Sequence, residues 1–323
     1  MLHEDERYMR RALQIAALGA GRTAPNPMVG AVVVCDGRII GEGYHVRCGG
    51  PHAEVNALAA VREADRALLP KATLYVSLEP CCHYGKTPPC SELIMRNGLH
   101  RVVVGCEDPF PKVNGGGIEQ LRAAGIEVTV GVLEEACKHL NRKFITYHTL
   151  RRPYVTLKWA VSADGYLDRW RERFEDTPAA KLSSERSQQW VHRLRSEAQA
   201  IVVGHRTLQL DRPRLNVRAW SGADPSPVVL GCVGEDELPA LWQAYDDTQT
   251  LLQALWQQGK QSVLVEGGRQ TLQTFIDEGL WDEAYEERSM VELGSGVPAP
   301  KMPVGVRVRV EQHFGSTFTH WEK

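Results

Sequence analysis

The sequence predicts an α/β protein built from two domains, and three observations support this prediction. The chain has 323 residues, which is enough for two domains of ordinary size. Apolar runs typical of strands alternate with segments of helical periodicity in both halves, as in α/β folds. The segment Arg151-Arg152-Pro153 begins a second series of such elements. We therefore expect one domain at residues 1–148 and a second at residues 149–323.

The first half begins with an amphipathic helix at residues 4–20, which has Met9 and Leu13 on its apolar stripe. Asp36-Gly37 lies between two apolar runs, and this pattern predicts a β-hairpin. Periodicity then predicts helices at residues 52–64, 91–97 and 118–124, alternating with strands at residues 73–78, 101–105 and 127–132. Strands that alternate with helices in this way indicate a sheet covered by helices.

Residues of the types that bind zinc lie between His52 and Cys90. His52 offers an imidazole, and Cys81 and Cys90 offer thiolates. A catalytic zinc site keeps its fourth position for water, so three protein ligands predict a catalytic site. Glu54 lies close enough in sequence to act on that water without being a ligand. The alternatives are a structural zinc site or buried free cysteines, and Cys82 is the nearest rival ligand.

These residues fit a known signature. Zinc nucleobase deaminases have the pattern His-x-Glu…Pro-Cys-x-x-Cys, in which the glutamate is the general acid and base. This chain has His52-Ala53-Glu54 followed by Pro80-Cys81, but eight residues separate Cys81 from Cys90. His52 and Glu54 are expected in the first turn of a helix, and Cys81 directly after a strand. Two helix starts and one strand end would therefore meet at one metal.

The longer spacing resembles one particular family. The segments Pro25–Gly30, His52-Ala53-Glu54 and Pro80–Cys90 look like the deaminase half of the bifunctional riboflavin-biosynthesis deaminase/reductases. The ending Thr-Pro-Pro-Cys distinguishes them from cytidine, tRNA-adenosine and deoxycytidylate deaminases. The resemblance implies a three-layer α/β/α cytidine-deaminase-like domain that binds Zn²⁺. It implies substrate contacts, by motif position, for Asn26, His45, His83 and Lys86.

A loop at residues 108–117 departs from the family pattern at Asn114 and Gly116, and we assign it no role.

The second half begins with a strand at residues 154–161 and a turn at residues 162–165. Ser184 is the expected N-cap of the next helix. Short buried strands follow at residues 200–204 and 262–265. The second of them runs into Gly267-Gly268 and a further helix. Glycines between a strand and a helix let a phosphate approach backbone N–H groups, although such a pair is also common in plain turns.

Three segments of this half resemble the reductase half of the same family: Lys158–Gly165, Thr207–Arg218 and Leu264–Gly268. The resemblance implies a dihydrofolate-reductase-like α/β domain that uses NADPH. An arginine can bind a phosphate bidentately, so Arg218 is the predicted phosphate anchor. By motif position, the expected NADPH contacts are Thr207, Asp211, Gly267 and Gly268, and the expected substrate contacts are Lys158, Leu215, Arg218 and Glu266.

Departures from the family pattern predict a weakened reductase. Lys181 stands where the family has a cofactor-stacking tryptophan, and Gln188 where it has an arginine. The stretch between Arg218 and Glu266 is expected to be shortened, without strands that help to form the nicotinamide-phosphate site. Residues 284–288 are unusually polar for a strand that should be central. We therefore expect weaker NADPH binding than in a complete family member.

Composition excludes several classes of function. Hydrophobic residues make up 43% and charged residues 24% of the chain, as in ordinary globular proteins. The formal net charge of −2 gives no basic excess for nucleic acid. No apolar run approaches the roughly 20 residues of a membrane helix, and the N-terminus lacks a signal-peptide core. The 8 cysteines do not form a disulfide framework in a chain this long and suit a reducing compartment. We expect a cytoplasmic protein that binds neither nucleic acid nor a membrane.

The resemblance implies an enzyme of riboflavin biosynthesis with a pyrimidine ribonucleotide substrate, and a homo-oligomer. Its first half would deaminate 2,5-diamino-6-ribosylamino-4(3H)-pyrimidinone 5′-phosphate by zinc-dependent hydrolysis. Its second half would reduce 5-amino-6-(5-phosphoribosylamino)uracil to the ribitylamino product with NADPH. The main alternative is a deaminase whose C-terminal domain has only a structural or assembly role. A nucleic-acid deaminase is disfavoured by the charge balance, and a plain zinc-binding module by the spare Glu54.

Overall fold

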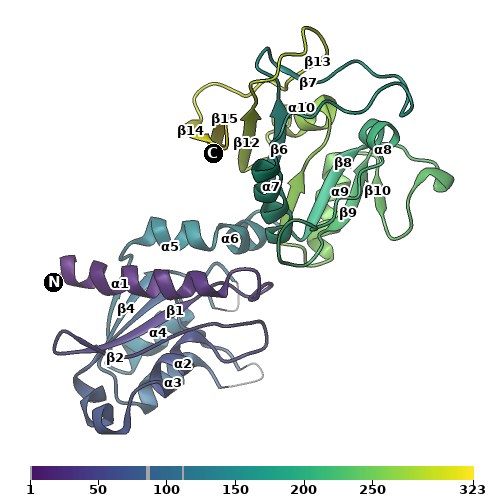
Figure 1. Cartoon of the computed structure of the whole chain (residues 1–323). Helices are drawn as coiled ribbons and strands as arrows, with labels where there is room; N and C mark the ends of the chain where they lie inside the picture. The colour runs from purple at the N-terminus through teal and green to yellow at the C-terminus, as the bar shows by residue number, and fades with distance from the viewer. Residues whose placement is uncertain (1, 85–87, 111–112) are drawn as a thin grey trace. The chain divides into compact units, whose positions relative to one another are not determined.

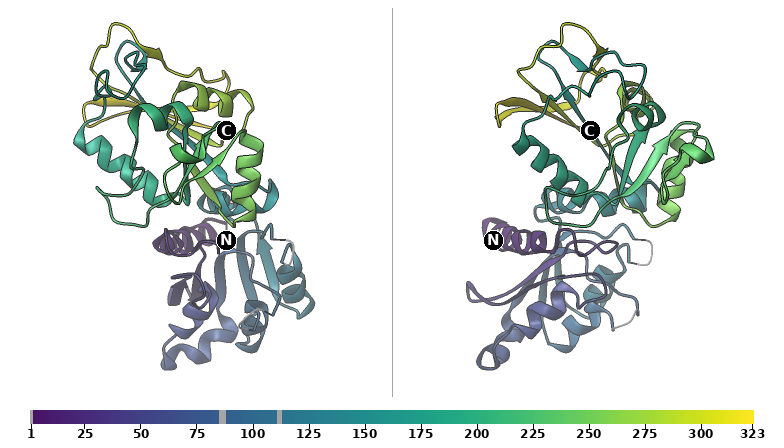
Figure 2. Two further views of the ribbon diagram at one scale, coloured as in Figure 1. Left: turned by 90° about the vertical axis from the view of Figure 1, so that its right-hand side faces the viewer. Right: turned by 45° about the vertical axis from the view of Figure 1, so that its right-hand side comes forward.

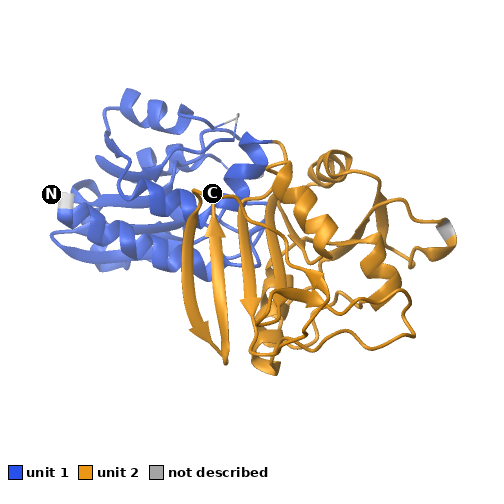
Figure 3. Cartoon of the chain, turned by 90° about the horizontal axis from the view of Figure 1, so that it is seen from above, with its two compact units in different colours: residues 1–150 blue, residues 151–323 orange. Residues whose placement is uncertain are grey.

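The computed structural model describes residues 2–84, 88–110 and 113–323. The chain forms two compact units, Met1–Leu150 (unit 1) and Arg151–Lys323 (unit 2), which are coloured separately in Figure 3. This division falls two residues after the expected boundary. Among the described residues, no helix is long and apolar enough to span a membrane.

Unit 1 contains a five-stranded sheet with strand order β2-β1-β3-β4-β5. The strands β3, β4 and β5 are parallel, whereas β1 runs antiparallel to both β2 and β3. The expected Asp36-Gly37 hairpin is present, with positive φ angles at both residues. The elements are α1 (Leu2–Ala16), β1 (Gly30–Cys35), β2 (Arg38–Tyr44), α2 (Ala53–Ala59), β3 (Thr73–Leu78), α3 (Cys90–Arg96), β4 (Arg101–Cys106), α4 (Gly116–Ala123), β5 (Glu127–Val130), α5 (Glu134–Leu140) and α6 (Arg142–Thr149).

Helices cover both faces of this sheet, with α1 and α5 on one side and α2 and α3 on the other (Figure 1). Alternate residues of β1 supply the two cores, because successive side chains of a strand point to opposite faces. Val33 packs with residues of α2, α3 and α4, and Val32 packs with residues of α1 and α5. The prediction of a three-layer α/β/α domain is thereby confirmed.

The helix expected at residues 52–64 is shorter than predicted. It ends at Ala59, and a 3₁₀ segment, η2 (Glu63–Lys71), follows it. Arg62 has an extended backbone, and its guanidinium and that of Arg38 both donate to the carboxylate of Asp65. These tertiary contacts override the local helical periodicity.

Unit 2 contains an eight-stranded sheet with the order β10-β9-β8-β11-β6-β12-β15-β14, and a small sheet of β13 and β7. Ser184 caps α7 as predicted, since its side chain accepts the N–H of Ser187. The elements are β6 (Tyr154–Val161), β7 (Tyr166–Asp168), α7 (Glu185–Glu197), β8 (Ala200–Gly204), α8 (His205–Asp211), β9 (Ser226–Leu230), β10 (Gln243–Tyr245), α9 (Thr248–Gln257), β11 (Ser262–Val265), α10 (Arg269–Asp277), β12 (Glu283–Arg288), β13 (Val297–Pro298), β14 (Arg307–His313) and β15 (Ser316–Glu322). Short 3₁₀ turns lie at Ala17–Gly19 (η1) and Glu235–Glu237 (η3).

The polar strand β12 is central, between β6 and β15, because its buried carboxylates have hydrogen-bond donors. Thr156 donates to Glu283 at 2.8 Å, and the Trp159 indole donates to Glu286 at 3.0 Å. Glu287 is fully buried and accepts from the Ser316 hydroxyl. A buried carboxylate is tolerated when it is hydrogen-bonded in this way.

Candidate active sites

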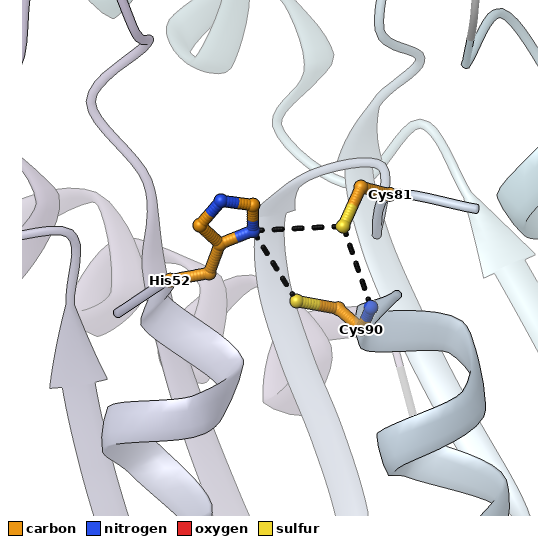
Figure 4. Close-up of side chains that lie close together, drawn as sticks. All are labelled: His52, Cys81 and Cys90. Atoms are coloured by element: carbon orange, nitrogen blue, oxygen red, sulfur yellow. Dashed lines mark hydrogen bonds between the residues drawn. The ribbon is translucent and has the colours of Figure 1, made fainter. Parts of the chain in front are cut away.

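His52, Cys81 and Cys90 meet in unit 1, as Figure 4 shows. The Nδ1 atom of His52 lies 3.5 Å from the Cys81 Sγ and 3.4 Å from the Cys90 Sγ. The three ligand atoms all lie within 4.8 Å of one another. Within the described ranges, this is the only group of three or more His, Cys, Asp or Glu side chains that could hold a metal.

Local structure brings the three side chains together. His52 is the N-cap of α2, Cys81 comes shortly after β3, and Cys90 is the first residue of α3. The helix α2 lies directly on β2, where Gly43 leaves room for it. A Cβ atom added to Gly43 would be only 2.4 Å from the backbone nitrogen of Ala57. A side chain at position 43 would therefore displace the helix that carries His52.

The electrostatics of this cluster suit a metal and a proton carrier. A hydrogen bond from the Cys90 thiol, followed by one from His52, holds the pKa of Cys81 well below its usual value. Glu54 is 3% exposed, and burial raises its pKa to about 7. One imidazole nitrogen and two sulfurs form a donor set that zinc accepts, and they leave a fourth position open. The residues present therefore fit a catalytic zinc ion.

Cys82, the rival ligand, lies outside this cluster. Its Sγ is 4.0 Å from the carbonyl oxygen of Val113 and close to Gly116, on the side of the loop that leads into α4.

Glu79 holds that loop, a role that the sequence analysis did not find. Its buried carboxylate accepts the backbone N–H groups of Asp108, Gly115, Gly117 and Ile118, at 2.8–3.2 Å. The described ends of the loop that was assigned no role are thus held together by one side chain. The position of Glu79, directly before Pro80-Cys81, was the only available signal.

Two of the predicted substrate contacts, Asn26 and His45, lie together beside the metal-ligand cluster. The Asn26 amide nitrogen is 3.1 Å from the Nε2 of His45, whose Nδ1 is 3.0 Å from the Pro51 carbonyl oxygen. The His45 ring stands edge-on to His52, with the ring centroids 5.7 Å apart. Both ring nitrogens of His45 therefore have partners within the protein, which fix the orientation of the imidazole beside His52.

His83, a third predicted contact, packs near Phe110, with 6.1 Å between the ring centroids. Its Nδ1 atom is buried and has no hydrogen-bond partner among the described residues. Lys86, the fourth predicted contact, lies outside the described residues.

Unit 2 has a cavity of ≈ 1370 Å³, which exceeds the roughly 300–1,000 Å³ that is typical of small-molecule sites. Leu215, one of the predicted substrate contacts, is not among the residues that line this cavity. Its side chain is buried among Ile201, Val203 and Leu264. Lys181 and Gln188, which replace the expected tryptophan and arginine, lie on the wall of the cavity. The other predicted reductase residues all lie on the wall of the cavity: Lys158, Thr207, Asp211, Arg218, Glu266, Gly267 and Gly268.

An arginine from α7 does reach the cavity, at a position that the sequence analysis missed. Arg195 donates two hydrogen bonds to Glu266, at 2.9 and 2.7 Å. Lys158 is buried near this pair, and burial lowers its pKa although Glu266 and Glu287 oppose the shift. The need of a buried Glu266 for a cationic partner was the signal that could have pointed to Arg195.

The predicted NADPH contacts occupy a different part of the wall. The Thr207 hydroxyl accepts the backbone N–H of Gly268 at 3.1 Å, which ties α8 to the start of α10. Asp211 is paired with Arg171, a 6% exposed residue that also binds Asp168. A cofactor that contacts Asp211 therefore meets a carboxylate already held by an arginine.

Comparisons with known proteins match both units. The model of the cytidine and deoxycytidylate deaminase zinc-binding region matches residues 2–106, and that of the RibD C-terminal domain matches residues 153–285. The riboflavin biosynthesis protein RibD of Aquifex aeolicus (strain VF5) is 40% identical over 326 residues, which cover 91% of this chain and 89% of that protein. The RibD of Bacillus amyloliquefaciens is 35% identical over 337 residues, 93% of this chain and 88% of that protein.

A solved structure extends the similarity to the fold. It is a diaminohydroxyphosphoribosylaminopyrimidine deaminase/5-amino-6-(5-phosphoribosylamino)uracil reductase from Thermotoga maritima, 36% identical to this chain with a TM-score of 0.87. The match covers 99% of both chains, so the expected shortening between Arg218 and Glu266 is not supported. That stretch folds as β9, β10 and α9. The prediction of an α/β reductase-like second domain is confirmed.

Proposed function

Because the chain belongs to the RibD family of riboflavin-biosynthesis deaminase/reductases, we propose that its units catalyse the two successive reactions named for the Thermotoga maritima relative. Unit 1 removes an amino group from the diaminopyrimidine ribonucleotide by hydrolysis. Unit 2 reduces the ribosyl group of the deaminated product with NADPH. The observation that carries the proposal is the cluster of His52, Cys81 and Cys90 with the buried Glu54 beside it.

In the deaminase reaction, His52, Cys81 and Cys90 would hold a zinc ion. When bound, zinc is a Lewis acid that lowers the pKa of a water molecule to about 7. Glu54 is buried beside these ligands, and burial raises its pKa, so it can take a proton from the attacking water and return it to the leaving nitrogen. Loss of that nitrogen as ammonia leaves a carbonyl oxygen on the pyrimidine ring.

Asn26, His45, His83 and Lys86 are the proposed contacts to the pyrimidine ribonucleotide. The carbonyl of Pro51 accepts from Nδ1 of His45 if that nitrogen carries the proton, and Nε2 can then accept from Asn26. Lys86 offers a point charge for the substrate phosphate.

In the reductase reaction, NADPH supplies the hydride when it is bound. Thr207, Asp211, Gly267 and Gly268 are the proposed cofactor contacts, and the glycines let a phosphate approach the backbone at the start of α10. The residues proposed to bind the substrate are Lys158, Leu215, Arg218 and Glu266. Arg218 receives the substrate phosphate, and Leu215 acts through its backbone because its side chain is buried.

The direct test is to incubate the purified protein with 2,5-diamino-6-ribosylamino-4(3H)-pyrimidinone 5′-phosphate, with and without NADPH, and to identify the products by mass. We expect the deaminated product without NADPH and the ribitylamino product with it. Deamination alone under both conditions would favour the alternative in which unit 2 has only a structural or assembly role. If the substrate is unchanged under both conditions, the proposed function and this alternative are both contradicted.

We also propose that the chain self-associates through β14, the outer strand of the unit 2 sheet, which is yellow in Figure 2. All seven residues of β14 are exposed, including Val308 and Val310 at 50% and 59%. An edge strand of this kind can pair with a second chain. Antiparallel pairing of two β14 strands about Val310 would place Arg309 opposite Glu311 twice.

We further propose a cytoplasmic location, since all eight cysteines are free thiols.

A further inference from the structure

The chain segment that carries Arg218 is attached to α7 by two side chains. Nδ1 of His192 accepts the backbone N–H of Arg218 at 3.1 Å. Nη1 of Arg195, one helical turn further along α7, donates to the backbone carbonyl of Asn216 at 3.2 Å. All three side chains that flank this junction, those of His192, Arg195 and Arg218, lie on the wall of the cavity in unit 2.

The residues before Arg218 are also fixed, so little freedom is left in its backbone. Leu215 has a positive φ of 51° and is buried among Ile201, Val203 and Leu264. A leucine adopts this conformation only where the surrounding packing imposes it. The Val217 N–H donates to the carboxylate of Asp224 at 2.7 Å. The hydrogen bond from the Arg218 N–H to His192 therefore completes the restraints on the backbone that orients the Arg218 side chain.

The side chain of Arg218 has a second restraint at its far end. Its Nη1 donates to the side-chain oxygen of Asn216 at 3.2 Å. Arg218 itself is exposed to solvent within the cavity. An arginine held at both its backbone and its guanidinium loses less conformational entropy when it binds a phosphate than a free one does.

His192 can accept this hydrogen bond only while its Nδ1 carries no proton. The ring is 3% exposed, and its charged neighbours are Arg195, Arg218 and Glu266. Burial lowers the pKa of His192, Arg195 and Arg218 lower it further, and Glu266 and a backbone hydrogen bond with Asn216 oppose the shift. The ring is therefore neutral at physiological pH, in the tautomer that leaves Nδ1 as an acceptor.

We propose that His192 is a positioning residue of the reductase site, whose Nδ1 holds the Arg218 backbone so that its guanidinium meets the substrate phosphate. The proposal rests on the proposed function, in which Arg218 is the phosphate anchor. His192 acts on binding and not on hydride transfer, because the phosphate keeps the same charge throughout the reaction. Its loss should therefore raise KM for the reductase substrate and leave kcat nearly unchanged.

Two amide substitutions separate this role from simple packing. In His192→Asn the side-chain oxygen can occupy the place of Nδ1, whereas in His192→Gln the amide lies near the place of Nε2. We expect KM for 5-amino-6-(5-phosphoribosylamino)uracil to stay within about threefold in His192→Asn and to rise about tenfold in His192→Gln. Deamination by the same preparations is the internal control, because unit 1 carries it.

The pH dependence gives a second readout. Protonation of His192 removes the acceptor, so the wild-type KM should rise as the pH falls below the ordinary histidine pKa, whereas asparagine does not titrate. The substrate phosphate also titrates in this range, so the quantity to follow is the ratio of the wild-type KM to the His192→Asn KM. We expect this ratio to rise as the pH falls from 7.5 to 5.5.

Three results would overturn the proposal: an unchanged KM in His192→Gln, equal losses in both variants, or a ratio that does not vary with pH. The variant Arg218→Ala tests the premise that Arg218 binds the substrate phosphate, separately from the role of His192. If Arg218→Ala raises KM but His192→Gln does not, His192 has no positioning role and Arg218 remains the anchor. If Arg218→Ala leaves KM unchanged, the proposed role of Arg218 fails and the role of His192 fails with it.

Discussion

Arg195 on α7 donates two hydrogen bonds to the carboxylate of Glu266, at 2.9 and 2.7 Å, and both side chains are 12% exposed. Burial alone would raise the pKa of Glu266, but the bonds from Arg195 lower it below its usual value. The pairing therefore keeps Glu266 ionised on the cavity wall, close to Lys158.

Replacing Arg195 by methionine should destabilise unit 2, because it leaves the charge of Glu266 buried without a partner. We expect the free energy of unfolding to fall by about 3 kcal/mol. All 8 tryptophans of the chain lie in unit 2, so their fluorescence reports the unfolding of this unit in urea. Arg193→Met is the matched control, since the pair of Arg193 and Glu197 is 57% and 42% exposed. It should change stability by less than about 1 kcal/mol, and equal effects would contradict the account.

Asp65 should give unit 1 a pH-dependent contribution to stability. Hydrogen bonds from Arg38, and then from Arg62, lower its pKa to about 2. A carboxyl group whose pKa is lowered by folding stabilises above its unfolded pKa, near 4, and loses this effect as the pH falls toward 2. Asp65→Asn should therefore lower the melting temperature at pH 7. The difference in melting temperature between the variant and the wild type should shrink as the pH falls from 5 to 3.

The melting of the two proteins can be followed by circular dichroism. Glu63→Gln is the control, because the Glu63 side chain is 92% exposed, and its gap to the wild type should stay small at every pH. A gap between Asp65→Asn and the wild type that is constant from pH 7 to pH 3 would show that the Asp65 charge does not stabilise unit 1.

Local signals in the sequence predicted most of the elements and the metal cluster. The Asp36-Gly37 turn, the Ser184 cap and the apolar strands each depend on neighbouring residues, so they can be read from short segments. The types and spacing of His52, Cys81 and Cys90 indicated their convergence. The helix at 52–64 was overestimated because Asp65 binds Arg38, a residue on another element.

Contacts between distant segments could not be predicted in this way. Arg195 and Glu266 are 71 positions apart, and Glu79 binds backbone groups up to 39 positions away. Neither pairing leaves a local pattern in the sequence. The polar strand β12 was unexpected at the centre of the sheet because Thr156 and Trp159, the partners of its carboxylates, lie on β6.

Glu79→Gln should loosen the loop that leads into α4. The amide keeps one acceptor oxygen but turns its NH₂ group toward N–H donors. Hydrogen bonds to a charged group contribute about 1.5–3 kcal/mol, so the amides of Gly115, Gly117 and Ile118 should exchange with deuterium at least tenfold faster. Amides in the centre of β4 serve as the control and should keep their protection. Unchanged protection at all three amides would mean that Glu79 does not hold the loop and the start of α4.

Self-association through β14 should respond to charge reversal. Arg309→Glu would place two pairs of like charges across the proposed interface and should shift the chain toward a monomer in light scattering. The double variant Arg309→Glu/Glu311→Arg restores opposite charges and should restore the association. A wild-type chain that is monomeric, or a single variant that associates as well as the wild type, would rule out this interface.

The most direct test of the account is the deaminase activity of zinc-loaded Glu54→Gln. The ligands His52, Cys81 and Cys90 are untouched, so metal analysis should find zinc bound as in the wild type. Ammonia release should fall by about 10²–10⁴-fold, because glutamine cannot carry the proton. NADPH-dependent reduction of 5-amino-6-(5-phosphoribosylamino)uracil by unit 2 should be unchanged, which controls for the amount of intact protein, while the bound zinc controls for the folding of unit 1. Ammonia release close to the wild-type rate by the zinc-loaded variant would contradict the central claim that Glu54 moves the proton at this site.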